Sequence, residues 1–232
     1  MTFKEDLLAA SKKIFADQWT TTAKTVVPVA ADLRLGNDAG EFKEMVVLYA
    51  DLDGSTAMVD TKKWEFSAEV YKSYLHCAAK IIKTEGGEIT AYDGDRIMAV
   101  FVGDWKNTNA VTAALKINYA LTNIVNPAMK SIYTTDFVIK HSIGIDVSPI
   151  RVARIGVKND NDLVWVGRAA NHAAKLTAIP VFGPVWISEA VYTSMKVGLR
   201  KHQDGTDAWE LRKWSQMNDL PVYRSNSVIA FD

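Results

Sequence analysis

Cysteine is nearly absent from the sequence, with Cys77 as the only one among 232 residues. A single cysteine excludes an internal disulfide framework and a thiolate zinc cluster, and it is typical of a reducing compartment, so we expect a cytoplasmic protein. The chain has only four histidines, His76, His141, His172 and His202. Their positions lack metal-like spacing or a paired nucleophile, which favours structural or surface roles for all four.

Long apolar runs and a net charge of one sign are missing as well. No run approaches the roughly 20 apolar residues that cross a bilayer, and charged residues interrupt the apolar ones near the N-terminus. Acidic and basic side chains balance at 27 each. The protein therefore has no global field that would draw it onto nucleic acid or an anionic membrane, and we expect neither as a partner.

The length and hydrophobic content, 232 residues and 48%, fit one sizeable core. Residues 3–27 carry large apolar side chains at three- and four-residue spacings, which predicts a helical stripe that packs on the rest of the chain or on a second copy. Residues 30–43 are polar and aperiodic, as in a connector. We therefore predict an N-terminal helical segment and connector over residues 1–42 and a main domain over 43–232.

Apolar periodicity and turn residues predict the elements of the main domain. Strands are expected at 45–50, on both sides of Asp93-Gly94-Asp95, at 137–147 and 150–157 with a break at Ser148-Pro149, and at 162–166, 209–214 and 220–224. Helices are expected at 63–83, 106–125 and 168–178. This order favours an α+β sheet covered by helices on one face over a doubly wound parallel sheet.

Two acidic turns, Asp51/Asp53 and Asp93/Asp95, are separated by one predicted helix. Carboxylates grouped in this way suit a pair of hard divalent cations such as Mg²⁺ or Mn²⁺. Strand alternation places Tyr49 on the same face as Asp51, beside the expected metals. Asp and Gly also populate ordinary turns, which remains an alternative for each motif taken alone.

Gly54-Ser55-Thr56 directly follows the first acidic pair and leads toward a helix. Free backbone amides at such a position can hold phosphate oxygens without any side chain. The same three residues are common in loops, so the motif by itself is a weak signal.

Four segments together resemble the catalytic domain of class III nucleotidyl cyclases. VVLYADLDGST is similar to the metal-binding strand and phosphate turn of that family, and GGEITAYDGDRIMAVF to its second metal hairpin. HSIGIDVSPIRVARIG and VWVGRAANHAAKL resemble its glycine-rich hairpin and the helix that carries the transition-state asparagine. The segments follow the family order over residues 43–180, so the resemblance identifies the main domain as a cyclase catalytic domain.

The resemblance implies a set of metal and phosphate ligands. Asp51 and Asp95 would hold two divalent cations per site, Mn²⁺ or Mg²⁺, helped by the backbone carbonyl of Leu52. The substrate would be a nucleoside triphosphate whose β- and γ-phosphates are cradled by three residues, Gly54, Ser55 and Thr56.

The resemblance also implies the remaining catalytic groups and the assembly. Asn171 matches the residue that orients the ribose, and Lys175 lies where the family usually has an arginine for the reacting phosphate. Lysine keeps the charge but lacks the planar guanidinium fork. The family fold is a ferredoxin-like mixed sheet that assembles as a head-to-tail homodimer. Metal aspartates from one subunit and the asparagine helix from the other would complete each site.

The base-reading positions depart from those of adenylate cyclases. That group has a lysine and an aspartate where this sequence has Ala91 and Val164. The missing purine pair, together with Tyr49 and Arg96, most resembles the pyrimidine cyclases of bacterial Pycsar anti-phage systems. Arg96 offers only hydrogen-bond donors, which suits the carbonyl oxygens of uracil, so UTP is expected. The product would then signal to a separate cyclic-nucleotide-sensing effector in antiviral defence.

Several alternatives remain open at this point. Strand alternation can instead send Arg96 to the face opposite Asp95, Tyr49 can be a core residue, and a cytidylate or adenylate cyclase is the runner-up activity. An apolar strand followed by Asp-x-Asp-Gly-Ser-Thr also occurs in haloacid-dehalogenase-type phosphohydrolases, although Asp95 precedes its strand here. A cyclase-like binding module without activity is a further alternative.

Overall fold

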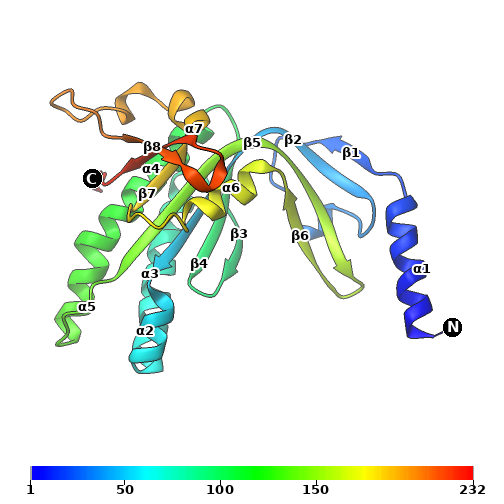
Figure 1. The fold of residues 1–232 in the computed structure, drawn as a ribbon, viewed down its shortest axis with the longest axis horizontal. Helices are drawn as coiled ribbons and strands as arrows, with labels where there is room; N and C mark the ends of the chain where they lie inside the picture. Colours follow the sequence, from blue (N-terminus) through cyan, green and yellow to red (C-terminus); the bar gives the residue numbers. More distant parts are fainter. Residues whose placement is uncertain (1, 232) are drawn as a thin grey trace.

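The centre of the molecule is a βαββαβ unit in the computed structural model, which describes residues 2–231 (Figure 1). Along the chain it comprises β2 (Asp38–Asp53), α3 (Trp64–Thr84), β3 (Glu88–Asp93), β4 (Arg96–Phe101), α4 (Lys106–Ala120) and β5 (Lys140–Val157). Its strands lie in the order β3-β4-β2-β5, and all neighbours are antiparallel. This is the ferredoxin-like arrangement, so the predicted α+β class is confirmed.

Further strands extend this unit into a nine-stranded mixed sheet. β7 (Val185–Ser188) pairs parallel with β5, and β9 (Leu220–Ser225) and β8 (Glu210–Trp214) follow as antiparallel neighbours. β1 (Thr20–Ala23) pairs with β2, and β6 (Asp160–Val166) forms a hairpin with β5. The remaining helices are α1 (Phe3–Ala16), α2 (Ser55–Thr61), α5 (Asn126–Ile132), α6 (Arg168–Leu176) and α7 (Glu189–Ser194). None of the helices within residues 2–231 combines the length and the apolar character that a membrane span requires.

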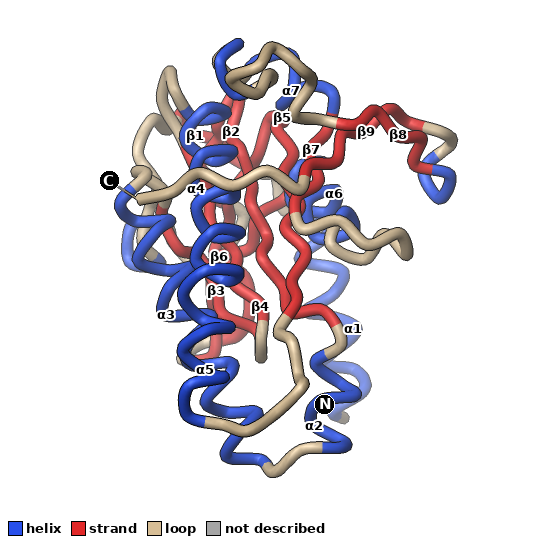
Figure 2. Tube along the Cα trace, turned by 90° about the vertical axis from the view of Figure 1, so that its left-hand side faces the viewer, coloured by secondary structure: helices blue, strands red, loops and turns tan. Residues whose placement is uncertain are grey.

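Alternate residues of β2 face two different cores. Val46 and Leu48 are completely buried against α3 and α4, whereas Met45 and Val47 pack with α6. Because side chains alternate along a strand, these two groups lie on opposite faces of the sheet. Figure 2 shows α3, α4 and α5 together on one face. The expected helical cover is therefore present, and α6 adds a helix on the face predicted to be bare.

The N-terminal region differs from the sequence prediction. The helix ends at Ala16 rather than continuing to residue 27, and residues 20–23 form β1. The predicted connector is also partly strand, because β2 begins at Asp38 and runs without interruption past residue 43. The pairing of β1 with β2 explains both differences, since contacts between distant segments override local propensity.

The predicted break at Ser148-Pro149 is also wrong, because β5 continues through both residues. Phe42 of β2 pairs with Ile150, whereas Met45 pairs with Ser148, so two residues of β2 bulge opposite Pro149. A bulge leaves ladder positions unpaired, which accommodates a proline that has no N–H to donate. The predicted helix over 106–125 likewise runs further, through a π-helical segment at Leu121–Val125 and into α5.

Candidate active site

The end of β2 and the β3–β4 hairpin bring the first predicted site residues together. Gly94 and Asp95 form a two-residue turn between the paired residues Asp93 and Arg96, and Gly94 has a φ of +61° that suits such a turn. β4 is the direct neighbour of β2, with Ile97 opposite Ala50. The predicted second acidic hairpin is therefore confirmed, and it lies beside the strand end that carries Asp51.

The electrostatics of Asp51 and Asp95 suit a bound cation. Burial is the main cause that raises the pKa of Asp51 to about 6; the nearby Asp95 carboxylate raises it further, and Arg96 opposes both. One carboxylate oxygen of Asp95, Oδ2, is buried and has no hydrogen-bond partner in the described part of the chain. Buried polar atoms are normally paired, so a cation between these carboxylates would satisfy this oxygen and remove their repulsion.

The protein ligands available for such a cation are few. The described residues contain no group of three or more His, Cys, Asp or Glu side chains that could hold a metal ion. Mg²⁺ is commonly held by one or two carboxylates together with substrate phosphates and water. Asp51, Asp95 and the carbonyl of Leu52 fit that pattern, in which the substrate supplies the other ligands.

Arg96 lies on the same side as Asp51. Its Nε atom is 3.7 Å from Asp51 Oδ2, and its guanidinium carbon is 5.9 Å from the centroid of the Tyr49 ring. Arg96 therefore lies beside Asp51 and Tyr49, as expected for the predicted base-reading residues. Tyr49 is half-buried, and burial raises the pKa of its phenol. The two predicted base-reading residues thus form one cluster with Asp51, the first predicted metal ligand.

The predicted phosphate turn opens α2. Gly54 has a φ of +74°, a conformation that favours glycine, and its carbonyl accepts the N–H of Met58. Ser55 is the first residue of α2, and Thr56 follows it at the exposed surface. The backbone after Asp53 therefore bends into a helix as expected.

Tyr71 of α3 belongs to the same region and was not predicted as a site residue. The pKa of its phenol is raised by burial and then by the Asp95 carboxylate. In the sequence, Tyr71 belongs to the apolar stripe of a helix and cannot be separated from core residues. Its position near Asp95 becomes evident only in the structure, where α3 packs beside the β3–β4 hairpin.

Asn171 and Lys175 lie together on α6. Both are exposed, whereas Ala169, Ala173 and Leu176 on the other side of the helix are completely buried. No hydrogen bond or ion pair among the described residues joins Asn171 or Lys175 to the metal aspartates. A single chain therefore carries two groups of predicted site residues, one at the ends of β2 and β3–β4 and the other on α6.

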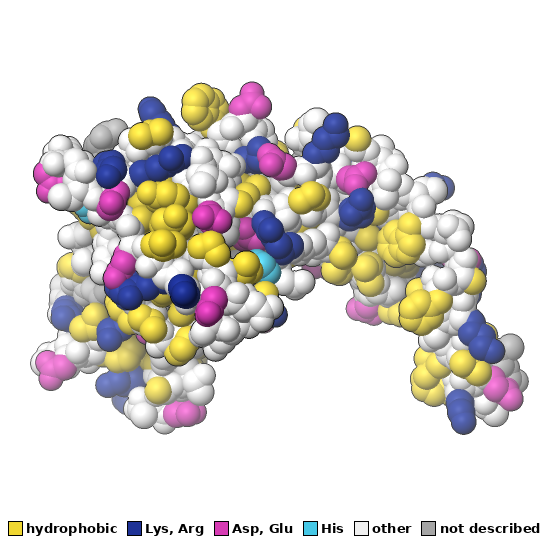
Figure 3. Space-filling view, turned by 45° about the horizontal axis from the view of Figure 1, so that its top comes forward, with side chains coloured by type: hydrophobic (Ala, Val, Ile, Leu, Met, Phe, Trp, Pro, Cys, Tyr) yellow, Lys and Arg dark blue, Asp and Glu magenta, His cyan; other side chains and the backbone are white. Residues whose placement is uncertain are grey.

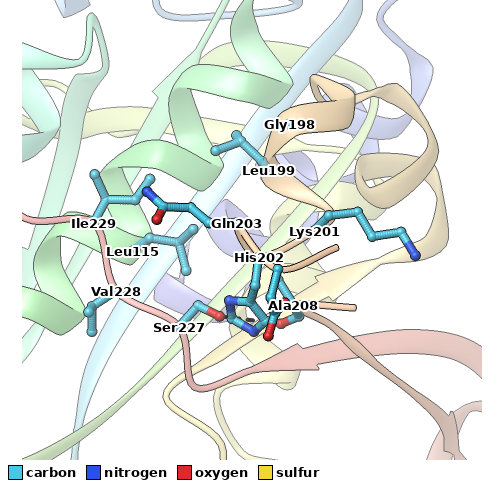
Figure 4. Close-up of a pocket in the computed structure, with 11 residues that line it drawn as sticks. Leu115, Gly198, Leu199, Lys201, His202, Gln203, Ala208, Ser227, Val228 and Ile229 are labelled. Carbon is cyan, nitrogen blue, oxygen red and sulfur yellow. Dashed lines mark hydrogen bonds between the residues drawn. The ribbon is translucent and has the colours of Figure 1, made fainter. Parts of the chain in front are cut away.

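A separate pocket of about 580 Å³ lies between α4 and the C-terminal segment (Figure 4). Leu115, His202, Gln203 and Ile229 are among its lining residues. None of the predicted site residues lines it, so the carboxylate cluster and this pocket are distinct places on the molecule.

Solved structures of nucleotidyl cyclases share this fold. The adenylyl cyclase CyaB from P. aeruginosa matches with a TM-score of 0.67 at 19% identity, covering 83% of this chain and 97% of that one. The guanylyl cyclase Cya2 also matches with a TM-score of 0.67, at 20% identity, covering 82% and 94%. No protein-family model matches the chain. The fold is therefore that of class III nucleotidyl cyclase domains.

Curated relatives assign the chain to a more specific family. A uridylate cyclase from Burkholderia cepacia is 51% identical over 94% of both chains, and one from Xanthomonas perforans is 47% identical over 97% of both. A uridylate cyclase from Rhodovulum sp. is 31% identical, again over 97% of both chains. The chain belongs to the uridylate cyclase family and is a nucleotidyl cyclase. This finding excludes the hypothesis of a haloacid-dehalogenase-type phosphohydrolase.

Proposed function

We propose that the protein converts UTP into 3′,5′-cyclic UMP and pyrophosphate by two-metal catalysis. The observation that carries this proposal is the position of Asp51, whose carboxylate interacts with that of Asp95 on one side and lies 3.7 Å from Arg96, which stacks over the Tyr49 ring, on the other. The two carboxylates suit divalent cations, and Arg96 together with Tyr49 suits a base. The names of the three relatives described above support uracil as that base.

Asp51, Asp95 and the carbonyl of Leu52 would hold two ions, Mn²⁺ or Mg²⁺. When bound, such ions would supply a lower pKa for the attacking ribose 3′-hydroxyl and charge neutralisation for the departing pyrophosphate. Gly54, Ser55 and Thr56 present backbone amides to the β- and γ-phosphates. These groups act by positioning and by charge, so the in-line displacement at the α-phosphorus requires no covalent nucleophile.

The α6 residues supply the other half of the reaction. Asn171 orients the ribose so that its 3′-oxygen faces the α-phosphorus. Lys175 places a positive charge near the oxygens that gain negative charge in the transition state. Both side chains are exposed on α6 and therefore accessible to a substrate.

The hydrogen-bond donors of Arg96 favour uracil over the other bases. Arg96 donates hydrogen bonds only, and these match the carbonyl oxygens of uracil, whereas the exocyclic amine of cytosine requires an acceptor. At the two positions where adenylate cyclases read the purine, Ala91 and Val164 are exposed and carry no polar side-chain atom. The site therefore lacks the groups that would select ATP.

We propose a head-to-tail homodimer that brings both groups of site residues to one substrate. In that arrangement, Asp51 and Asp95 of one subunit face Asn171 and Lys175 of the other. The apolar stripe on α1 supports self-association, because none of its residues is buried in the single chain. We therefore expect this stripe to pack against a second copy of the chain.

The biological role proposed here is anti-phage signalling of the Pycsar type. Cyclic UMP would act as a second messenger on a separate effector that senses cyclic nucleotides. The resemblance of Tyr49, Arg96 and the missing purine pair to the pyrimidine cyclases of Pycsar systems supports this role.

An Asp51→Ala variant tests the metal assignment. We expect it to abolish cyclic UMP formation from UTP with Mn²⁺ or Mg²⁺ while thermal unfolding changes little, because the change removes a ligand rather than core volume. Asp60→Ala, at an exposed position of α2, is the matched control and should keep full activity. Full turnover by Asp51→Ala would contradict the proposal.

A further inference from the structure

Three alternate residues of β5, Gly144, Asp146 and Ser148, face α6. A Cβ atom at Gly144 would lie 2.1 Å from the carbonyl oxygen of Ala173, so glycine is what lets the helix lie this close to the strand. At the start of the helix, the Ser148 hydroxyl accepts the N–H of Ala169 at 2.9 Å. One face of β5 therefore fixes both the distance and the N-terminal end of α6.

Asp146 supplies a charged link between these two contacts. Its side chain has 0% exposure, and it accepts hydrogen bonds from Arg168 Nε at 3.2 Å and Nη2 at 3.3 Å. The same guanidinium donates to the Val147 carbonyl at 2.7 Å. A buried carboxylate requires such pairing, because an isolated charge away from water is strongly destabilising.

His172 makes a second link to the same carboxylate. Its Nδ1 atom is 3.3 Å from Asp146 Oδ2, and its ring packs edge-on against Trp214 with 5.4 Å between the ring centroids. Arg168 and His172 are four residues apart and therefore lie on one side of the helix. Both contact one carboxylate, so the rotation of α6 about its own axis is restricted.

We propose that Asp146 is a positioning residue that sets the rotation of α6 and thereby directs Asn171 and Lys175 toward the substrate. The inference rests on the proposed cyclase function. Asn171 directly precedes His172, so a turn or shift of the helix moves it as well. Misplacement of a reacting group by about 1 Å can lower the rate by about 100-fold.

Steady-state kinetics of Asp146→Asn test this role. The substitution keeps the shape of the side chain but removes the charge that holds Arg168. We expect kcat to fall by about 10- to 100-fold with little change in KM for UTP, because α6 acts on the transition state rather than on triphosphate binding. An unchanged kcat would overturn the proposal.

Glu85→Gln is the matched control for a merely structural effect. Glu85 forms a partly buried pair with Lys116 at 2.7 Å, which links the end of α3 to α4 away from both groups of site residues. Glu85→Gln should lower the thermal stability about as much as Asp146→Asn does, and it should keep its kcat. An equal loss of kcat in both variants would reduce Asp146 to a general stability role and overturn the proposal.

Mixed dimers separate this role from the proposed function. Differently tagged chains are co-expressed, and dimers containing one of each are purified. Asp51→Ala paired with Asn171→Ala should regain activity from one intact site. Without this gain, the shared-site dimer of the proposed function fails, and the kcat comparison alone decides the role of Asp146.

If that mixed dimer regains activity, Asp146→Asn should give the same results as Asn171→Ala in mixed dimers. Paired with Asp51→Ala, it should recover one intact site, because the α6 half comes from the other chain. Paired with Asn171→Ala, it should recover none. Recovery in the second mixture, or failure in the first, would overturn the positioning role.

Discussion

Arg96 is the residue at which the proposed metal and base functions meet. Its guanidinium lies 3.7 Å from Asp51 and 4.0 Å from Asp93, and it also lies over the Tyr49 ring. The arginine therefore lowers the pKa of Asp51, and in the proposed function its donors also bind the base. In the proposed function, one side chain therefore affects both the charge at the metal ligands and the choice of substrate.

An Arg96→Lys variant separates these two effects. Lysine retains the positive charge near Asp51 but lacks the planar set of donors, so we expect the preference for UTP over CTP and ATP to fall by about 10-fold. The measurement is kcat/KM for each triphosphate. A matched control is Tyr92→Phe, because Tyr92 is an exposed residue of the same hairpin. A uniform fall across all substrates would instead indicate general positioning.

The side on which Arg96 lies could not be predicted from the sequence. Alternation alone leaves two faces possible, and the register of β3 against β4 shifts between Ile89 and Ala91. A bulge of this kind changes which residues share a face. The acidic residues themselves were predictable because Asp, Gly and Ser mark turns at fixed positions between apolar strands.

At the scale of elements, close packing of α6 on β5 depends on Gly144. A Gly144→Ala change places a methyl group against the Ala173 carbonyl, so the helix must move. We expect a loss of about 1–3 kcal/mol in the free energy of unfolding, measured by urea denaturation, together with reduced turnover. Gly198→Ala is the control, because a Cβ there meets no atom within 4 Å. Equal stability of the two variants would contradict this account of α6.

Elements with strong local signals were predicted well and those defined by distant pairing were not. The helix predicted over 63–83 corresponds to α3, and the hairpin around Gly94 is present. β1 and β7 are only four residues long and exist through pairing with β2 and β5. Such short strands carry too little periodicity to be recognised in the sequence.

At the scale of the whole molecule, α1 stands away from the sheet. Figure 3 shows apolar side chains along this projecting part of the surface, and Phe15 of α1 is 90% exposed. Exposed apolar surface of this extent is typical of a binding face. The sequence predicted the stripe but left open what it packs on, because that depends on a second surface.

Charged substitutions in the stripe test the proposed homodimer. Leu8→Asp combined with Phe15→Asp should weaken dimerisation, because burial of these side chains in an interface would become unfavourable. Light scattering coupled to size-exclusion chromatography measures the mass of the particle. Lys12→Glu, a polar position of α1, serves as the control and should leave the mass unchanged. The same dimeric mass for all variants would exclude the stripe from the interface.

The central claim is that this cyclase selects UTP, and a competition experiment tests it most directly. The purified protein is incubated with equimolar ATP, GTP, CTP and UTP in the presence of Mn²⁺ or Mg²⁺, and the products are identified by mass spectrometry. The account predicts cyclic UMP as the main product. Cyclic AMP as the main product would contradict it and would show that Tyr49 and Arg96 do not read the base.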